Sequence, residues 1–144
     1  TVINRYGTGT QTTAIYKDFG LARGALASTI SHDSHNLTVA YRDPKDAYLA
    51  AETLRECAGG VCIADNGEVT TLPLPVAGLM SQMVCADVAA QIEAVQKKLG
   101  SMTDGTVTLL ATAIMALPVL PGVIITDRGL VDGLSQQFIE QFED

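Results

Sequence analysis

Hydrophobic and polar residues alternate in the first third of the chain, and this two-residue period predicts β-strands. Along residues 24–30, Leu26 and Ile30 fall on one side of the predicted strand, and the same alternation carries His32 to that side. Residues 37–41 alternate in the same way after a short polar interval. The two strands are therefore predicted to be neighbours, antiparallel if the connection between them is tight.

Apolar residues at helical spacing predict helices farther along the chain. Asp43 and Pro44 are a typical helix start, since Asp caps free N–H groups and Pro suits the first turn. A second helix is predicted after a cap at Asp87. A third, apolar almost all round and therefore buried, is predicted at residues 106–117. A further short helix is predicted at residues 77–84.

Turn signals separate the remaining elements. Asn66-Gly67 predicts a type I′ hairpin. In Asp127-Arg128-Gly129, with Asp132 close by, an ion pair is expected to close a second turn. The tail, residues 135–144, is expected to be a docking helix or an expression remnant. Further strand candidates are residues 2–6, 12–16, 61–64, 68–72 and 123–125. Together these elements predict one α+β domain at residues 1–134, with a mixed, largely antiparallel sheet and about three packed helices.

Composition narrows the class of protein. Apolar residues make up 47% of the 144 residues, which is typical of a folded domain with a core. The formal net charge of −7 argues against nucleic acid as a partner, because few cations are present to neutralise phosphates. Residues 107–125 approach membrane-spanning length, but Pro118, Pro121 and Gly122 interrupt them, so no membrane association is expected.

The cysteines indicate the cellular compartment, and the first residues indicate whether the chain is a piece of a longer polypeptide. Cys57, Cys62 and Cys85 form no Cys-x-x-Cys pair, and an odd number cannot all pair within one chain. Each lies among apolar residues, so buried, reduced thiols in a cytosolic protein are preferred over a reactive thiol. The chain starts in a strand-like segment without Met or a signal peptide, and it is expected to be a piece of a longer polypeptide.

The most polar interval is Ser31-His32-Asp33-Ser34-His35-Asn36, which holds both histidines of the chain. Functional groups are often carried on such loops. A metal site usually needs three or four ligands, so His32 and His35 would require carboxylates in addition. The candidates are Asp33, Asp43 and Asp127.

A hydrolytic triad is also incomplete in this interval. Ser31 and Ser34 lie beside His32, but the Gly-x-Ser-x-Gly turn that exposes a nucleophile is absent. The residues alone therefore favour a structural loop, in which Ser, Asp and Asn side chains cap backbone groups and the histidines are partly solvated.

Several segments together resemble one protein family. They are residues 3–7 (INRYG), 24–36 (GALASTISHDSHN), 72–81 (LPLPVAGLMS) and 116–132 (ALPVLPGVIITDRGLVD). In content and order they are similar to the C-terminal domain of bacterial-type adenine deaminase, and the SHDSHN and LPLPxAGLMS segments are quite specific to that family. The resemblance covers nearly the whole chain but not the tail after Asp132.

The resemblance implies part of an amidohydrolase-superfamily enzyme that converts adenine to hypoxanthine and ammonia in the cytoplasm. A divalent metal, manganese or iron, would be held by an N-terminal (β/α)8 barrel outside this chain. No metal ligand is then expected here, and the fragment alone is expected to be inactive. His32, Asp33 and His35 are the candidates for catalytic support, and Ser34 and Asn36 for substrate contact. The expected partners are the barrel, adenine and further copies of the chain.

Two other interpretations stay open. One is a non-catalytic packing and oligomerisation domain, whose interfaces would come from the third helix and the Leu-Pro-Leu-Pro segment. The other is a stand-alone metallohydrolase that uses His32 and His35.

Overall fold

The computed structural model describes residues 1–142, and its centre is a six-stranded sheet. The strands are ordered β2-β1-β4-β3-β5-β6, and every neighbouring pair is antiparallel. Their bounds are Val2–Ile3 (β1), Gln11–Thr12 (β2), Ala25–Ser28 (β3), Leu37–Tyr41 (β4), Gly60–Asp65 (β5) and Glu68–Pro73 (β6). The antiparallel pairing predicted for the strands on either side of the polar interval is confirmed, since Ala27 lies opposite Val39.

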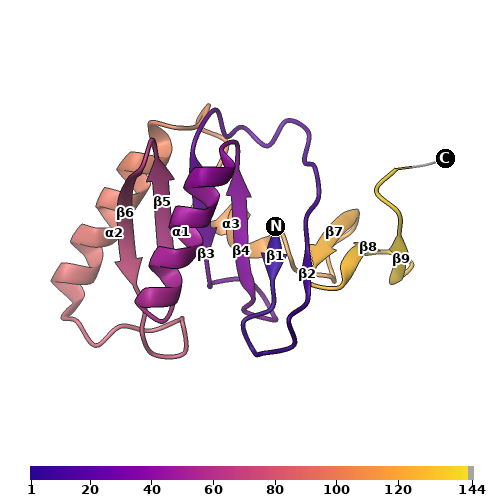
Figure 1. Cartoon of the computed structure of the whole chain (residues 1–144), viewed down its shortest axis with the longest axis horizontal. Coiled ribbons are helices and arrows are strands. Elements are labelled where there is room, and N and C mark those ends of the chain that lie inside the picture. Colours follow the sequence, from indigo (N-terminus) through magenta and orange to yellow (C-terminus); the bar gives the residue numbers. More distant parts are fainter. Residues whose placement is uncertain (143–144) are drawn as a thin grey trace.

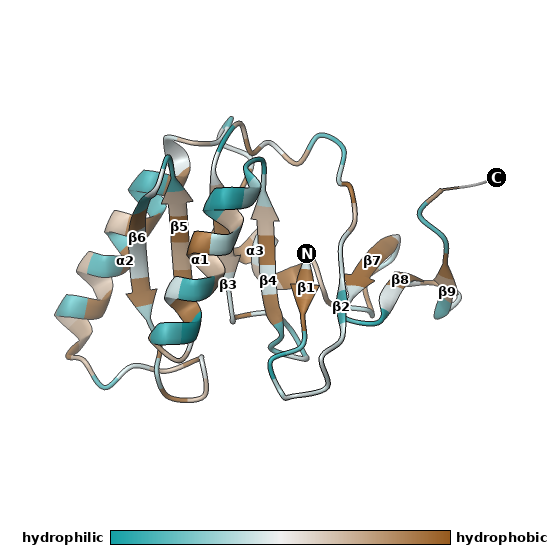
Figure 2. Cartoon of the chain, viewed as in Figure 1, coloured by the Kyte–Doolittle hydropathy of each residue, from teal (hydrophilic) through white to brown (hydrophobic). Residues whose placement is uncertain are grey.

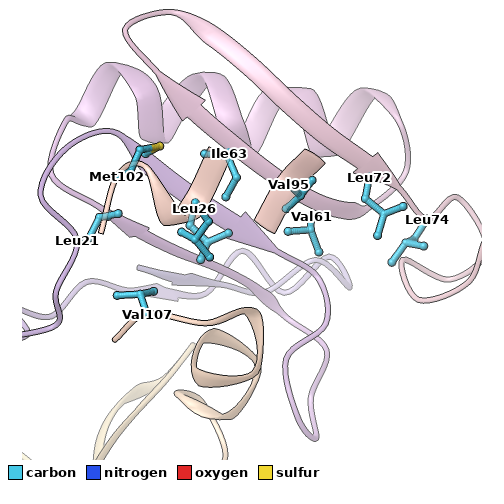
Figure 3. Packing of buried hydrophobic residues seen from close by; sticks show 10 residues of the cluster. Leu21, Leu26, Val61, Ile63, Leu72, Leu74, Val95, Met102 and Val107 are labelled. Carbon is cyan, nitrogen blue, oxygen red and sulfur yellow. The ribbon is translucent and has the colours of Figure 1, made fainter. Parts of the chain in front are cut away.

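Two helices cover opposite faces of this sheet, α1 (Pro44–Glu56) and α2 (Cys85–Gly100) (Figure 1). The alternation of side chains in β3 and β5 decides which residues meet which helix. Leu26 and Ile63 face α2 and pack in one buried cluster with Val95 (Figure 3). Ala27 belongs to the opposite cluster, with Leu54 of α1. The small side chains on the α1 side let that helix lie close to the sheet.

Two of the local predictions are confirmed where α1 meets the β5–β6 hairpin. The Asp43 carboxylate accepts hydrogen bonds from the N–H groups of Lys45 and Asp46, so it caps α1 as expected. Asn66 and Gly67 have φ angles of 54° and 81°, the positive values that a type I′ turn requires. The buried Asp46 carboxylate accepts the N–H groups of both turn residues, each at 3.0 Å. Helix and hairpin are therefore tied together.

A second, three-stranded antiparallel sheet packs beside the first. It consists of β7 (Val123–Thr126), β8 (Gly129–Asp132) and β9 (Gln137–Ile139), and α3 (Leu109–Ile114) precedes it. Ile125 and Leu130 join it to Val2 of the large sheet in a small buried cluster. Figure 2 shows hydrophobic residues on β7 and β9 at this side of the molecule. The predicted α+β class is confirmed, with the strands divided between two antiparallel sheets.

Two predicted elements in the second half of the chain are wrong in type or extent. The docking helix expected at residues 135–144 is absent where the structure describes it, because Gln137–Ile139 pair with β8 as a strand; residues 143 and 144 lie outside the described residues. The third helix covers only Leu109–Ile114, starting at a Thr108 cap, and Leu110 is exposed rather than buried.

Other boundaries also differ from the predictions. Residues 77–84 contain a turn in place of the short helix, because Ala77 and Gly78 have φ angles of 58° and 75°. Helix α2 starts at Cys85, so Asp87 lies in its first turn and does not cap it. The strand expected at residues 12–16 is limited to Gln11–Thr12.

The cysteines lie in three different environments. Cys62 is buried as expected, and its burial raises the pKa of its thiol. Cys57 is half-buried and Cys85 is exposed, so the prediction of burial is wrong for the latter. Within residues 1–142, no helix is long and apolar enough to cross a membrane.

Candidate functional site

The polar interval forms the loop between β3 and β4, and its main chain is held by hydrogen bonds. The His35 N–H donates to the Ser31 carbonyl at 2.6 Å and closes a turn. The His32 N–H donates to the carbonyl of Ala113 in α3 at 2.9 Å. His35 itself has a φ of 51°, in the left-handed region that few residues other than glycine adopt. The backbone of the loop is therefore fixed from within and from α3.

The loop brings its two imidazoles together. The ring centroids of His32 and His35 lie 5.8 Å apart, with an angle of 65° between the ring planes. His32 is exposed and His35 is half-buried. The prediction that His32 continues the Leu26 side of the strand is wrong, because β3 ends at Ser28 and the chain then turns.

The other polar side chains of the loop differ in what they contact. Ser31 is buried, and its hydroxyl shares a 2.9 Å hydrogen bond with that of Thr38. The Ser34 hydroxyl accepts the Asn36 N–H at 3.3 Å, which is the backbone capping that the structural interpretation expects. Asp33 is exposed and makes no side-chain hydrogen bond among residues 1–142.

Two buried polar atoms of the loop have no hydrogen-bond partner in the described part of the chain. They are Nδ1 of His35 and Oδ1 of Asn36, and the Asn36 residue is only 2% exposed. Buried polar atoms without partners are uncommon in folded proteins, because each loses its bonds to water without replacing them. The loop thus keeps unused hydrogen-bonding capacity inside an ordered backbone.

Arg5 and Tyr6, which follow β1, contact this loop and were not identified as site residues from the sequence. The Arg5 side chain donates to the His35 carbonyl at 2.5 Å, and the Tyr6 hydroxyl donates to the Ser34 carbonyl at 2.9 Å. Both belong to the INRYG segment that contributes to the family resemblance. The signal that could have found them is an arginine directly after an apolar strand start, in the same set of segments as the loop.

Two of the three carboxylates proposed as extra metal ligands, Asp43 and Asp127, are engaged elsewhere, whereas Asp33 is free of side-chain hydrogen bonds among residues 1–142. Asp43 caps α1, and Asp127 accepts hydrogen bonds from the Asn4 amide at 3.1 Å and the Thr10 hydroxyl at 2.6 Å. Burial pushes the pKa of Asp127 upward, but the bonds from Thr10 and Asn4 outweigh it and hold this pKa below its ordinary value. The ion pair predicted in this turn is wrong: among the described residues, Arg128 forms no ion pair with Asp127 or Asp132, and the Asp127 carboxylate accepts hydrogen bonds from Asn4 and Thr10 instead.

No group of three or more potential metal-ligating side chains occurs anywhere in residues 1–142. His32 and His35 supply two imidazoles at most, which is fewer ligands than a stable site needs. The loop instead combines two imidazoles, a free carboxylate and a buried amide, all of which can exchange hydrogen bonds or protons with a polar ligand. The loop is therefore a candidate for part of a site, since among residues 1–142 it presents hydrogen-bonding groups without a group of three metal-ligating side chains.

Comparison with known proteins supplies the context for this candidate site. The family model for the adenine deaminase C-terminal domain matches residues 1–137. Adenine deaminase from Leuconostoc citreum is 40% identical over 96% of the chain, and that from Moorella thermoacetica is 39% identical over 96%. Adenine deaminase from Cereibacter sphaeroides is 44% identical over 91%. The chain spans only 25%, 24% and 24% of these relatives, respectively. The chain belongs to the adenine deaminase C-terminal domain family.

Proposed function

We propose that this chain is the C-terminal domain of an enzyme that hydrolyses adenine to hypoxanthine and ammonia. The support is the family match together with curated relatives that are named adenine deaminases. The chain covers about a quarter of those relatives, and we propose that residues outside it complete the active site. The isolated domain is accordingly proposed to be inactive, and the complete enzyme to act in purine breakdown in the cytoplasm.

The metal of the proposed enzyme belongs to the other part of the polypeptide. A manganese or iron ion held by an N-terminal amidohydrolase barrel would supply the activated water. The described residues of this chain do not fit such an ion, since His32 and His35 are brought together but no group of three potential ligands forms among residues 1–142. What this chain contributes is therefore a set of hydrogen-bonding and proton-transferring groups.

The loop at residues 31–36 is proposed to form one wall of the shared site. The observation that carries this role is its ordered backbone, combined with Nδ1 of His35 and Oδ1 of Asn36 left without partners. The leaving amine of adenine must gain a proton, which an imidazole of His32 or His35 can deliver, with Asp33 as a proton acceptor beside them. Ser34 and Asn36 are proposed to contact the purine.

The test is substitution of the two histidines in the complete enzyme that contains this domain. His32→Ala and His35→Ala are each expected to lower kcat/KM for adenine by about 100-fold, the usual contribution of a positioned proton donor. Glu93→Ala, on the exposed side of α2, is the control and should leave kcat/KM unchanged. Unchanged kcat/KM in both histidine variants would reduce the loop to a structural role. Ammonia release from adenine by the 144-residue chain alone would contradict the proposed inactivity.

A second candidate function is supported by exposed apolar side chains in the small sheet and in the turn that connects β8 to β9. Leu134 is 79% exposed and Phe138 is 65% exposed, although both are large and hydrophobic. Exposed hydrophobic side chains can mark an interface, so the domain would serve packing and assembly of the enzyme. Light scattering on the 144-residue chain and on a Phe138→Ser variant tests this: a homo-oligomer that dissociates in the variant supports it, and a strict monomer counts against it.

A further inference from the structure

Three segments that are distant in the sequence meet at the side chain of Arg5. They are the stretch after β1, the loop at residues 31–36 and the turn at residues 76–80. The guanidinium donates through Nε to the carbonyl of His35 and through Nη2 to the carbonyl of Ala77, both at 2.5 Å. One planar group thus connects the candidate loop to a turn on another part of the chain.

The turn is shaped to receive this guanidinium. Gly78 has a φ of 75°, and a Cβ atom added to it would lie 2.9 Å from Nη2 and 3.0 Å from Cζ of Arg5. A side chain at this position would therefore displace the guanidinium. The Arg5 Cζ also lies 5.1 Å from the centre of the Tyr6 ring, so an aromatic face and a glycine both contact the cation.

The turn is itself anchored to the large sheet. The buried Thr29 hydroxyl donates to the Gly78 carbonyl at 2.6 Å and accepts the Gly60 N–H of β5 at 2.8 Å. The connection from the rigid sheet to the loop therefore runs through Thr29, Gly78 and Arg5. No carboxylate lies within ion-pair distance of Arg5 among residues 1–142, so the cation is committed to backbone carbonyls.

We infer that Arg5 is a positioning residue that sets the conformation of the 31–36 loop and, through it, the placement of His32 and His35 in the active enzyme. The second half of this inference rests on the proposed function. Arginine suits the role because its planar fork presents two N–H groups in fixed directions, whereas lysine offers one ammonium group on a flexible stem. Among residues 1–142, the hydrogen bonds of the Arg5 side chain go to backbone carbonyls, so the proposed route to the loop is through the His35 carbonyl.

The first experiment measures the loop directly in the 144-residue chain. Because the chain has only two histidines, labelling them with ¹³C and ¹⁵N gives NMR signals from His32 and His35 alone. Contacts between their ring protons are expected in the wild type, where the centroids lie 5.8 Å apart, and should be lost in Arg5→Ala. Arg42→Ala is the matched control, because Arg42 also donates to a backbone carbonyl, that of Leu21, at the opposite end of the strands.

Two milder variants keep the test informative if Arg5→Ala does not fold. Arg5→Lys retains the charge but can reach one carbonyl only, so the ring contacts should be weakened rather than lost. Gly78→Ala leaves Arg5 in place but obstructs its guanidinium, and should disturb the same signals. Circular dichroism establishes that each variant is folded. Ring contacts that persist in folded Arg5→Ala or Arg5→Lys, at wild-type intensity, would overturn the inference whatever the enzyme does.

The second experiment measures activity in the complete enzyme. Arg5→Ala should lower kcat for adenine by about 100-fold with little change in KM, since displacement of a catalytic group by about 1 Å has this effect. Free guanidinium ion added to Arg5→Ala should restore at least part of kcat, and should not affect Arg42→Ala. Normal kcat in Arg5→Ala, alongside impaired His32→Ala and His35→Ala, would overturn the inference while the proposed function stands. Normal kcat in all three variants would instead overturn the role proposed for the loop.

Discussion

Two polar turns join neighbouring strands of the large sheet, and they use their polar groups in opposite ways. In the β5–β6 hairpin, the Asp46 carboxylate accepts both turn N–H groups, and Asp65 accepts hydrogen bonds from Lys98 at 2.9 Å and Arg23 at 3.2 Å. In the loop at residues 31–36, the backbone is bonded, but His35 Nδ1 and Asn36 Oδ1 are buried without partners among residues 1–142.

On the proposed function, this difference separates a stabilising turn from a functional loop. A buried carboxylate that accepts several hydrogen bonds stabilises the fold. Its removal leaves the donors without an acceptor, which lowers the free energy of unfolding. An ordered loop whose side chains remain without partners gains no comparable stability from them, so their presence needs another reason. The hairpin is thus expected to respond to substitution mainly in stability, and the loop mainly in activity.

The largest expected effect is on Asp46 of α1. Asp46→Ala removes the acceptor of two N–H groups and should lower the free energy of unfolding by about 3 kcal/mol, because each bond to a charged group contributes about 1.5–3 kcal/mol and the exposed turn regains some hydration. Urea denaturation of the 144-residue chain measures it. The same substitution in the loop, Asp33→Ala, should change stability by less than about 0.5 kcal/mol. Equal losses in the two variants would remove the distinction between the turns.

The next largest effect is at Asp65, whose ionisation makes the stability of the fold depend on pH. Hydrogen bonds from Lys98, and then from Arg23, outweigh the effect of burial and hold the pKa of this carboxyl below its ordinary value. The carboxylate therefore stabilises the fold above the pKa of the unfolded state, about 3.9 for Asp, and this contribution is lost as the pH falls through the lower folded-state pKa.

Asp65→Asn should accordingly have a lower Tm than the wild type at pH 7, and the two Tm values should converge in acid. Thermal unfolding between pH 7 and pH 2 measures the convergence. Asp33→Asn is the control, whose Tm should follow that of the wild type throughout. A constant difference between Asp65→Asn and the wild type at every pH would contradict the assignment.

A smaller effect is expected at the buried base of the loop, where Ser31 and Thr38 share a hydrogen bond. Ser31→Ala leaves the Thr38 hydroxyl buried without its partner, which should cost about 1–2 kcal/mol. The double variant Ser31→Ala/Thr38→Val removes both polar groups and should recover most of this loss. A double-mutant cycle from urea denaturation gives the coupling, and strictly additive losses would show that the pair is not coupled.

The hairpin and the loop also differ in how far the sequence predicts them. Asn66-Gly67 is a local signal, because the positive φ angles it favours are those of the turn it forms. The loop has local hydrogen bonds too, but other contacts that hold it come from distant positions: Arg5 donates to the carbonyl of His35, 30 positions along the chain, and also to that of Ala77, 72 positions along. The polar character of the loop could be read from the sequence, but its link to Arg5 could not, since no periodic pattern encodes it.

The C-terminal tail gives the same lesson for secondary structure. Its apolar residues have helical spacing, yet Phe138 lies opposite Val131 in a strand pair. In a short segment of this kind, contacts with neighbouring elements decide between helix and strand. The edge of β8 has free N–H and C=O groups that pair with the segment as a strand. The positive φ angles of Ala77 and Gly78 likewise form a turn where a helix was expected.

The smallest expected effect on stability is at His32, the residue that differs most from Asp46 of the hairpin contact. Its side chain is exposed and makes no side-chain hydrogen bond among residues 1–142, so His32→Ala removes only the edge contact with His35. The free energy of unfolding should therefore change by less than about 0.5 kcal/mol, as at other exposed positions. Urea denaturation of the 144-residue chain and kcat/KM of the complete enzyme together test whether activity falls while stability does not. A loss of several kcal/mol would place His32 in the structural class of Asp46, and the loop would then be a second stabilising turn.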